Sequence, residues 1–299
     1  MASAKPVKVL DPLNTHLTIV GCGGTGSFLL KNVCRLLWGL KEQRRAAYEA
    51  PRMLGQPFGQ PPREEIPEVM LCDGDVVERK NVIRQDFVPT DVGRPKALVL
   101  AERYSAAYGV TVRAYPRYLG RDTDLARISP EGGVVAGCVD NAPTRRLLHE
   151  QLSRYHDVVY LDSGNAGVEV SADETREGRL TRSEQAAARG SGWDGQVLCG
   201  VRKGGEGMIP FPAEAMPDLI EPGEAGDERL PDEVPCGEVI ESLPQRQMTN
   251  LLAATMMMSY LTTLLSEGTL LHSRSFFCAR RGYVKSYPAM DELDEVALA

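Results

Sequence analysis

Glycines, carboxylates and cations follow one another along the first half of the chain in an order that suits a nucleotide. The glycines form a turn, Gly21-x-Gly23-x-x-Gly26 with a fourth at Gly24, between a short apolar run and a helical pattern that begins at Phe28. Glycine lets the backbone approach a phosphate closely, and free N–H groups at a helix start attract anions. The pattern predicts a phosphate-binding turn. Enzymes that use NAD, FAD or ATP share it, and a tight turn that binds nothing looks the same.

An acidic pair follows the second predicted strand. Residues 69–72 are apolar and lead into Asp73-Gly74-Asp75. In a nucleotide-binding strand–turn–helix unit, an acid at the end of the second strand binds the ribose hydroxyls. That acid usually lies about 20 residues after the glycines. The spacing here is longer, and we interpret residues 39–67 as an insertion between the first helix and the second strand. Residues 41–50 can still be helical, but five prolines from Pro51 on prevent a regular continuation.

The polar segment after this acidic pair is rich in hydrogen-bond donors. It contains Asn81, Arg84 and Gln85, and Lys96 follows Pro95 at the start of a helix predicted to reach Tyr108. Arginine offers phosphate oxygens a planar fork and lysine a compact charge, so this pair suits a triphosphate. A nicotinamide dehydrogenase would have no evident use for them. The alternative is a solvated polar loop.

A further acid, Asp140, ends the predicted strand 133–139. Asn141 is expected to cap a helix that reaches about Tyr155, with Pro143 in its first turn. Asp140 then lies at the carboxyl end of a strand, where open α/β sheets bind their ligands. Its alternative role is that of a turn residue.

Strands and helices alternate through the first half of the chain, which predicts an α/β fold with a mostly parallel sheet. The predicted strands are 17–20, 69–72, 110–115, 133–139 and 158–161. After Gly164 the alternation stops, and antiparallel strands are expected to extend the sheet. The expected segments are strands at 168–170 and 196–201, a mobile loop at 171–194, a long crossover loop at 203–247, an apolar helix at 248–266, and a hairpin of 275–279 with 283–287. We predict one domain over 1–299.

Composition excludes several classes of function. The net charge of −7 argues against a broad nucleic-acid surface. Residues 248–265 carry no charge, but the Thr, Ser and Asn side chains among them favour a core or dimer-interface helix over a membrane span. The seven cysteines are scattered without a Cys-x-x-Cys pair, and the N-terminus has no apolar leader. These features predict a cytoplasmic protein without a structural zinc site.

Taken in order, these motifs resemble the ThiF/MoeB/ubiquitin-activating superfamily of adenylating enzymes. The order is Gly-x-Gly-Gly-x-Gly-Ser, Asp-x-Asp, Asn-x-x-Arg-Gln, Gly-x-Pro-Lys and Asp-Asn. The resemblance covers residues 15–170 well, and the crossover loop and apolar helix more loosely. It is strongest to the bacterial proteins found with ubiquitin-like partners, such as the PRTRC-system ThiF type. It implies a Rossmann-like fold.

The resemblance also implies a reaction and roles for the residues. Gly21–Gly26 would hold the phosphates of ATP and Asp73 the ribose, with Asp75 and Gln85 in the same site. Asn81, Arg84 and Lys96 would neutralise the polyphosphate, and Asp140 would hold Mg²⁺. The substrate would be a small ubiquitin-like or sulfur-carrier protein that ends in Gly, and its C-terminal carboxylate would attack the α-phosphate. A conjugating enzyme and a homodimer partner are further expectations.

One cysteine and three alternative functions stay open at this stage. Cys236, at the end of the crossover segment, is the candidate nucleophile for a thioester; the alternative is a loop cysteine without chemistry. The chain could instead be a dehydratase of the same superfamily that acts on a small molecule or tRNA base, or an inactive scaffold half. The Arg84, Lys96 and Asp140 set argues against a scaffold.

Overall fold

Five short parallel strands form the centre of the chain. The structure is a computed structural model that describes residues 5–53, 66–166, 191–221, 229–231, 233 and 246–290. The parallel strands lie in the order β4-β3-β2-β5-β6. They are β2 (Leu17–Val20), β3 (Val69–Cys72), β4 (Val112–Tyr115), β5 (Val134–Gly137) and β6 (Val158–Ala166). The predicted fold class, α/β with a mostly parallel sheet, is confirmed.

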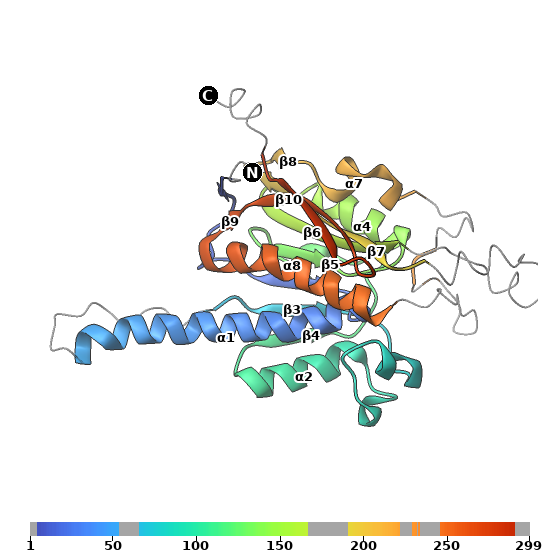
Figure 1. Cartoon of the computed structure of the whole chain (residues 1–299), viewed down its shortest axis with the longest axis horizontal. Helices are drawn as coiled ribbons and strands as arrows, with labels where there is room; N and C mark the ends of the chain where they lie inside the picture. The colour runs from blue at the N-terminus through green and yellow to red at the C-terminus, as the bar shows by residue number, and fades with distance from the viewer. Residues whose placement is uncertain are drawn as a thin grey trace, which may run out of the picture.

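Antiparallel strands extend the sheet beyond β6, in the order β6-β7-β10-β11 (Figure 1). They are β7 (Asp194–Lys203), with β8 (Glu206–Ile209) on its flank, β10 (His272–Cys278) and β11 (Tyr283–Pro288). The predicted terminal hairpin is therefore present. A separate pair joins β1 (Val7–Lys8) to β9 (Thr269–Leu270).

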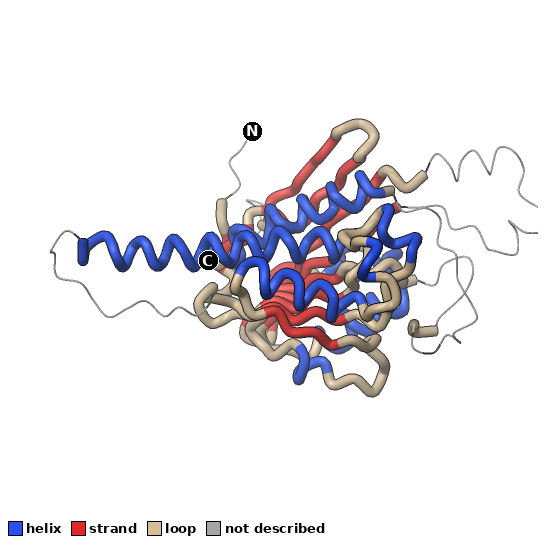
Figure 2. Tube along the Cα trace, turned by 90° about the horizontal axis from the view of Figure 1, so that it is seen from below, coloured by secondary structure: helices blue, strands red, loops and turns tan. Residues whose placement is uncertain are grey.

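Helices cover both faces of the sheet, because its buried strands alternate their apolar side chains between two cores. Ile19 faces a core shared with α1 (Gly24–Met53), α2 (Lys96–Tyr108) and α8 (Gln247–Glu267), while Val20 faces the core of α4 (Ala142–Leu152). Figure 2 shows α1, α2 and α8 side by side over the sheet, with the C-terminal end of α1 extending past it. Shorter helices are η1 (Arg79–Ile83), η2 (Pro89–Asp91), α3 (Leu125–Ile128), α7 (Pro212–Ala215) and η3 (Pro217–Leu219).

Two predicted loops are wrong in part. In the insertion predicted at 39–67, the helix allowed at 41–50 is present, but α1 continues past Pro51 to Met53. The crossover loop predicted at 203–247 contains β8, α7 and η3, because Ile209, Phe211 and Leu219 supply buried apolar anchors. Most of the loop predicted at 171–194 and the strand at 168–170 lie outside the described residues, although β7 already begins at Asp194.

The apolar helix is predicted almost to the residue. Among the described helices, α8 alone has the length and composition that would allow it to cross a membrane. Half of its most apolar window is buried inside the fold, where it packs against α1, β6 and β7. Burial of Ala253, Met257 and Leu261 favours a core helix.

Candidate active site

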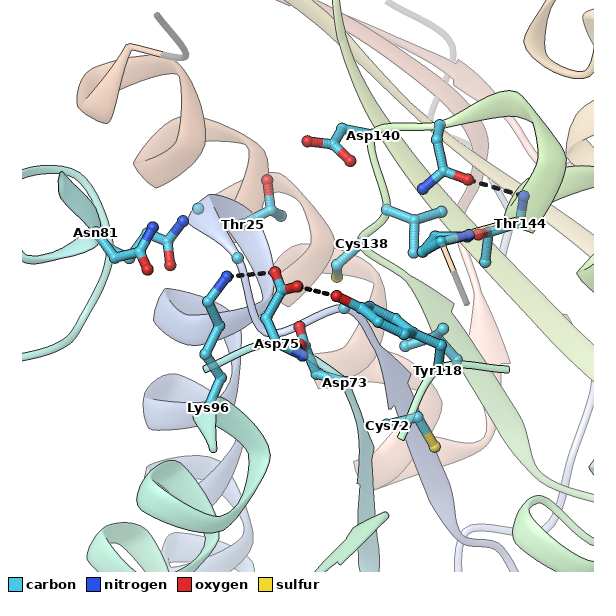
Figure 3. A pocket seen from close by; sticks show the side chains of 18 of the residues that line it. Thr25, Cys72, Asp73, Asp75, Asn81, Lys96, Tyr118, Cys138, Asp140 and Thr144 are labelled. Atoms are coloured by element: carbon cyan, nitrogen blue, oxygen red, sulfur yellow. Dashed lines mark hydrogen bonds and ion pairs between the residues drawn. The ribbon is translucent and has the colours of Figure 1, made fainter. Parts of the chain in front are cut away.

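A cavity of about 360 Å³ opens at the carboxyl edge of the parallel strands (Figure 3). Parallel strands place their ends, and the loops that follow, along one edge of the sheet. Segments far apart in the sequence therefore meet there. The predicted residues that line the cavity are Gly21, Gly23, Gly24, Asp73, Asp75, Asn81, Arg84, Gln85, Lys96 and Asp140. Gly26 lies behind it in α1, and Cys236 lies outside the described residues.

At two positions of the glycine turn, neighbouring backbone leaves no room for a side chain. Gly21 has φ +93°, and a Cβ there would lie 2.6 Å from the carbonyl oxygen of Cys138. A Cβ on Gly26 would lie 1.9 Å from the carbonyl oxygen of Gly21. At Gly23, by contrast, the nearest atom to a Cβ is the amide nitrogen of Gln85, 3.9 Å away. Gly21 and Gly26 thus shape the turn, and Gly23 leaves its cavity side open.

Asp73 fastens this turn to the end of β3. Its Oδ2 accepts a hydrogen bond from the backbone N–H of Cys22 at 2.5 Å, and its Oδ1 accepts one from Asp75 at 2.8 Å. Burial raises the pKa of the Asp73 carboxyl to about 6, against the opposing charge of Lys96. Both oxygens already serve the backbone, so contact with a ribose would use the remaining lone pairs. The ribose role stays a prediction.

Lys96 forms a largely buried ion pair at the β3 end of the cavity. Its ammonium lies 2.7 Å from Oδ2 of Asp75, with only 6% of the side chain exposed, and Tyr118 donates its hydroxyl to Oδ1 of the same carboxylate. Burial alone would lower the pKa of Lys96, but the charges of Asp73 and Asp75 raise it. Burial would likewise raise the pKa of Asp75, yet the Lys96 charge and both hydrogen bonds lower it. The positive charge of Lys96 is therefore already balanced by the two carboxylates before any ligand binds.

The loop around η1 presents the second predicted cation. Asn81 is buried and its Oδ1 accepts the N–H of Glu78, which closes the turn. The N–H of Asp86 donates to Ser27 Oγ at 3.1 Å, which ties the loop to α1. Within the part of the chain that the structure describes, Nη1 of Arg84 and Oε1 of Gln85 are buried without a hydrogen-bond partner. Unpaired buried polar atoms are costly, so this wall of the cavity is built for a polar ligand.

Asp140 and Asn141 form the rim opposite, after β5. Asn141 caps α4 as predicted, with its Oδ1 accepting the N–H of Thr144 at 2.9 Å. Asp140 is exposed at the cavity mouth. The described residues contain no group of three or more metal-ligating side chains. Magnesium, however, is commonly held by one or two carboxylates together with substrate phosphates, so this single acid suits the predicted role.

Arg117, Tyr118, Ser163 and Asn165 also line the cavity, and the sequence analysis did not single them out. Each follows or ends a strand at the carboxyl edge of the sheet. Polar residues just after residues 110–115 and within Asp162-Ser163-Gly164-Asn165 were the available signal. This signal was missed because none of the motifs identified in the sequence includes these positions.

The thiols near the cavity are unsuited to nucleophilic chemistry. Burial raises the pKa of Cys72 to about 12 and also raises the pKa values of Cys22 and Cys138, with nearby carboxylates adding to the effect. The thiolate is the reactive form, so these residues are inert packing groups. Six of the seven cysteines are described, and Cys236 is the seventh.

A parallel α/β sheet with a glycine turn, an acid and cations at its carboxyl edge defines a nucleotide-binding protein. A sequence profile of the ThiF family matches residues 8–175, more than half of the chain, and the chain belongs to the ThiF family. The predicted family is thereby confirmed. No curated protein sequence matches this chain significantly.

Solved structures show where the same fold occurs. MccB of E. coli with ATP superposes with a TM-score of 0.55 at 15% sequence identity, covering 93% of this chain and 65% of MccB. E. coli MccB with AMPCPP and the SeMet form of MccA gives 0.55 at 14% identity, with the same coverage. SeMet PaaA gives 0.52 at 13% identity, covering 94% of this chain and 66% of PaaA. The chain spans slightly less than two thirds of the MccB chain.

Proposed function

We propose that this protein uses ATP to adenylate the C-terminal carboxylate of a peptide or small protein. One observation carries the proposal: a single cavity joins the glycine turn at the start of α1 to Arg84, whose Nη1 is buried without a partner among the described residues. One similar MccB structure holds ATP, and another holds both AMPCPP and MccA. These matches support the nucleotide and the class of substrate.

The proposed reaction asks for positioning and charge rather than covalent chemistry by the protein. A carboxylate oxygen attacks the α-phosphorus of ATP, a new P–O bond forms, and the bond to the β-phosphate breaks with loss of pyrophosphate. Arg84 would donate to phosphate oxygens, and the N–H groups at the start of α1 would face the same charge. Lys96 would add charge from within its ion pair with Asp75.

Asp140 would hold magnesium together with phosphate oxygens. Bound there, the ion would supply charge stabilisation on the polyphosphate. The position fits, because Asp140 is exposed at the cavity that Arg84 also lines.

The finer proposal is that the substrate is a ubiquitin-like or sulfur-carrier protein ending in Gly, with a conjugating enzyme as a possible later partner. The resemblance to bacterial ThiF-type proteins with such partners supports it. In a following step, the sulfur of Cys236 would attack the carbonyl carbon of the adenylate, forming a thioester and releasing AMP. A reducing-agent-sensitive adduct that is lost in Cys236→Ala would support this step; an adduct that persists there would contradict it.

Pyrophosphate exchange tests the central proposal. With Mg-ATP and a candidate carrier, label should pass from pyrophosphate into ATP, and calorimetry should show binding of Mg-ATP. Tight binding of NAD with no binding of ATP would overturn the proposal. Asp140→Asn should weaken exchange and shift its magnesium requirement upward.

We also propose a homodimer, since α8 is only half buried and the superfamily usually pairs through such elements. Light scattering at micromolar concentration should give twice the 32.7 kDa chain mass. A monomer mass would contradict this.

A further inference from the structure

The end of β6 contributes an uncharged polar wall to the cavity. Ser163 and Asn165 are two residues apart on one strand, so their side chains lie on the same face of the sheet, and both line the cavity. In the described part of the chain, Oγ of Ser163 and Oδ1 of Asn165 are buried without a hydrogen-bond partner. Native proteins rarely leave such buried polar atoms unpaired, so we expect a polar group of a ligand to bind to this wall.

A second asparagine fixes the orientation of the first. Nδ2 of Asn165 donates to Oδ1 of Asn250 at 2.6 Å, and Asn250 is fully buried in the first turn of α8. The Asn250 amide packs against Gly24, where a Cβ would lie 2.0 Å from its Nδ2, an atom that also lacks a partner among the described residues. This bond uses one of the two amide hydrogens of Asn165 and leaves its Oδ1, a hydrogen-bond acceptor, without a partner among the described residues.

The wall is too far from the proposed ribose acid to contact the nucleoside. In the sheet, β3, which ends at the proposed ribose acid, is separated from β6 by β2 and β5. Three strand spacings amount to roughly 14 Å. The glycine turn, after β2, lies between them. The β6 wall therefore lies beyond the glycine turn from the ribose acid, with Asn250 against Gly24, and an acceptor oxygen there would repel phosphate oxygens.

The spacing of the wall matches an extended peptide. Residues two apart on a strand are separated by roughly 7 Å, which is also the repeat of alternate peptide groups in an extended chain. Neutral hydroxyl and amide groups suit the N–H and C=O groups of such a chain better than they suit a charged group.

We propose that Oδ1 of Asn165, oriented by Asn250, accepts a hydrogen bond from a backbone N–H in the extended C-terminal segment of the acyl substrate. The inference rests on the proposed adenylation and adds a residue that binds the backbone of its substrate. Asn165 is a binding residue and Asn250 a positioning residue. Such a contact recognises the peptide backbone next to the reacting carboxylate and does not depend on the side chains of the substrate.

Calorimetry with stable acyl-adenylate mimics tests this contact. The reference probe is acetyl-Gly-Gly joined to sulfamoyl adenosine. In two ester analogues, one or other of the two peptide N–H groups is replaced by oxygen. One neutral hydrogen bond is worth about a 3- to 10-fold change in Kd, so one ester should bind the wild type that much more weakly than the reference.

In Asn165→Ala, the reference probe should bind about 3- to 10-fold more weakly, and the ester should lose no further affinity. Asn250→Ala should reduce the ester effect in the same way. Asn32→Ala, an asparagine on α1 that bonds the Phe28 carbonyl, is the matched control and should keep the full effect. Asn165→Ser replaces the alanine variant if that variant does not fold.

Two outcomes would overturn the inference while the proposed function stands. One is that neither ester weakens binding to the wild type; the other is an equal ester effect in wild type and Asn165→Ala. If the wild type binds neither Mg-ATP nor any of the sulfamoyl probes, the proposed adenylation itself fails. The two failures are thus distinguishable.

Discussion

The two ends of the cavity satisfy their polar atoms in different ways. At the β3 end, Asp73, Asp75 and Lys96 are bonded to one another, to Tyr118 and to the backbone. At the β6 end, Ser163 and Asn165 keep atoms without partners in the described part of the chain. The first end is organised before any ligand arrives, while the second is completed by one. The difference indicates that the two ends serve different substrates.

Removal of the buried Lys96 ammonium should destabilise the β3 end of the cavity. Lys96→Met leaves Asp73 buried without its neutralising charge, and loss of one partner from a buried pair costs about 3–5 kcal/mol of unfolding free energy. Asp75 is 45% exposed, so the lower part of this range is expected. Denaturant unfolding at pH 8 measures the loss.

For the same variant, we can predict the direction in which its loss of stability changes with pH. The folded-state pKa of Asp73 is raised to about 6, so its contribution to stability is greatest at low pH and is lost as the pH rises through that value. Without Lys96 this pKa rises further. The deficit of Lys96→Met should therefore be smaller at pH 5 than at pH 8. A deficit that grows on acidification would contradict the assigned network.

Arg84 tests the middle of the cavity, where an unpaired donor meets the proposed phosphates. In Arg84→Ala, loss of a charged phosphate contact should cost about 2–4 kcal/mol of transition-state stabilisation. Pyrophosphate exchange measures this cost. Arg79→Ala is the matched control, because Arg79 is exposed on the same loop and does not line the cavity. Equal rates in Arg84→Ala and Arg79→Ala would remove Arg84 from the proposed role.

Substitutions at two glycines test two different roles: Gly26 determines the shape of the turn, and Gly23 leaves the turn open to a ligand. Gly26→Ala forces a Cβ against the backbone of Gly21 and should destabilise the fold by about 1–3 kcal/mol. Gly23→Ala has room, so its stability should stay within about 0.5 kcal/mol of wild type while affinity for Mg-ATP falls. Thermal unfolding and calorimetry on both variants check the contrast. Equal destabilisation would show that the open side of Gly23 is structural.

The smallest expected effect concerns the rim between the two ends. Asn141→Ala removes the side-chain cap of α4 and should cost about 1 kcal/mol of stability, whereas Asn141→Ser keeps an oxygen that can cap. Denaturant unfolding of the pair checks this. A serine variant as unstable as the alanine variant would mean that the loss is not one of capping.

Local patterns in the sequence predicted most elements of the fold and the charged end of the site. The run 17–20, the glycine turn and the Asn141 cap act through neighbouring residues, and the structure shows each in place. Lys96 was also predicted as a cation of the site from a local pattern, its position after Pro95 at the start of a helix. Its partner Asp75 was predicted as a site residue, but their pairing depends on where β3 ends relative to α2.

What only the tertiary structure decided is which distant side chains share the cavity. Asn165 and Asn250 are 85 positions apart, and neither belongs to a motif, yet α8 brings them into contact beside Gly24. No local pattern can encode this, because it depends on packing α8 across the sheet. Burial likewise decided that Cys22 and Cys138 are inert and that residues 206–219 are ordered. The sequence by itself determined the fold class, the family and most of the residues that line the β3 end of the cavity, where we propose that the nucleotide binds. Contacts across the sheet determined the end that we propose binds the peptide.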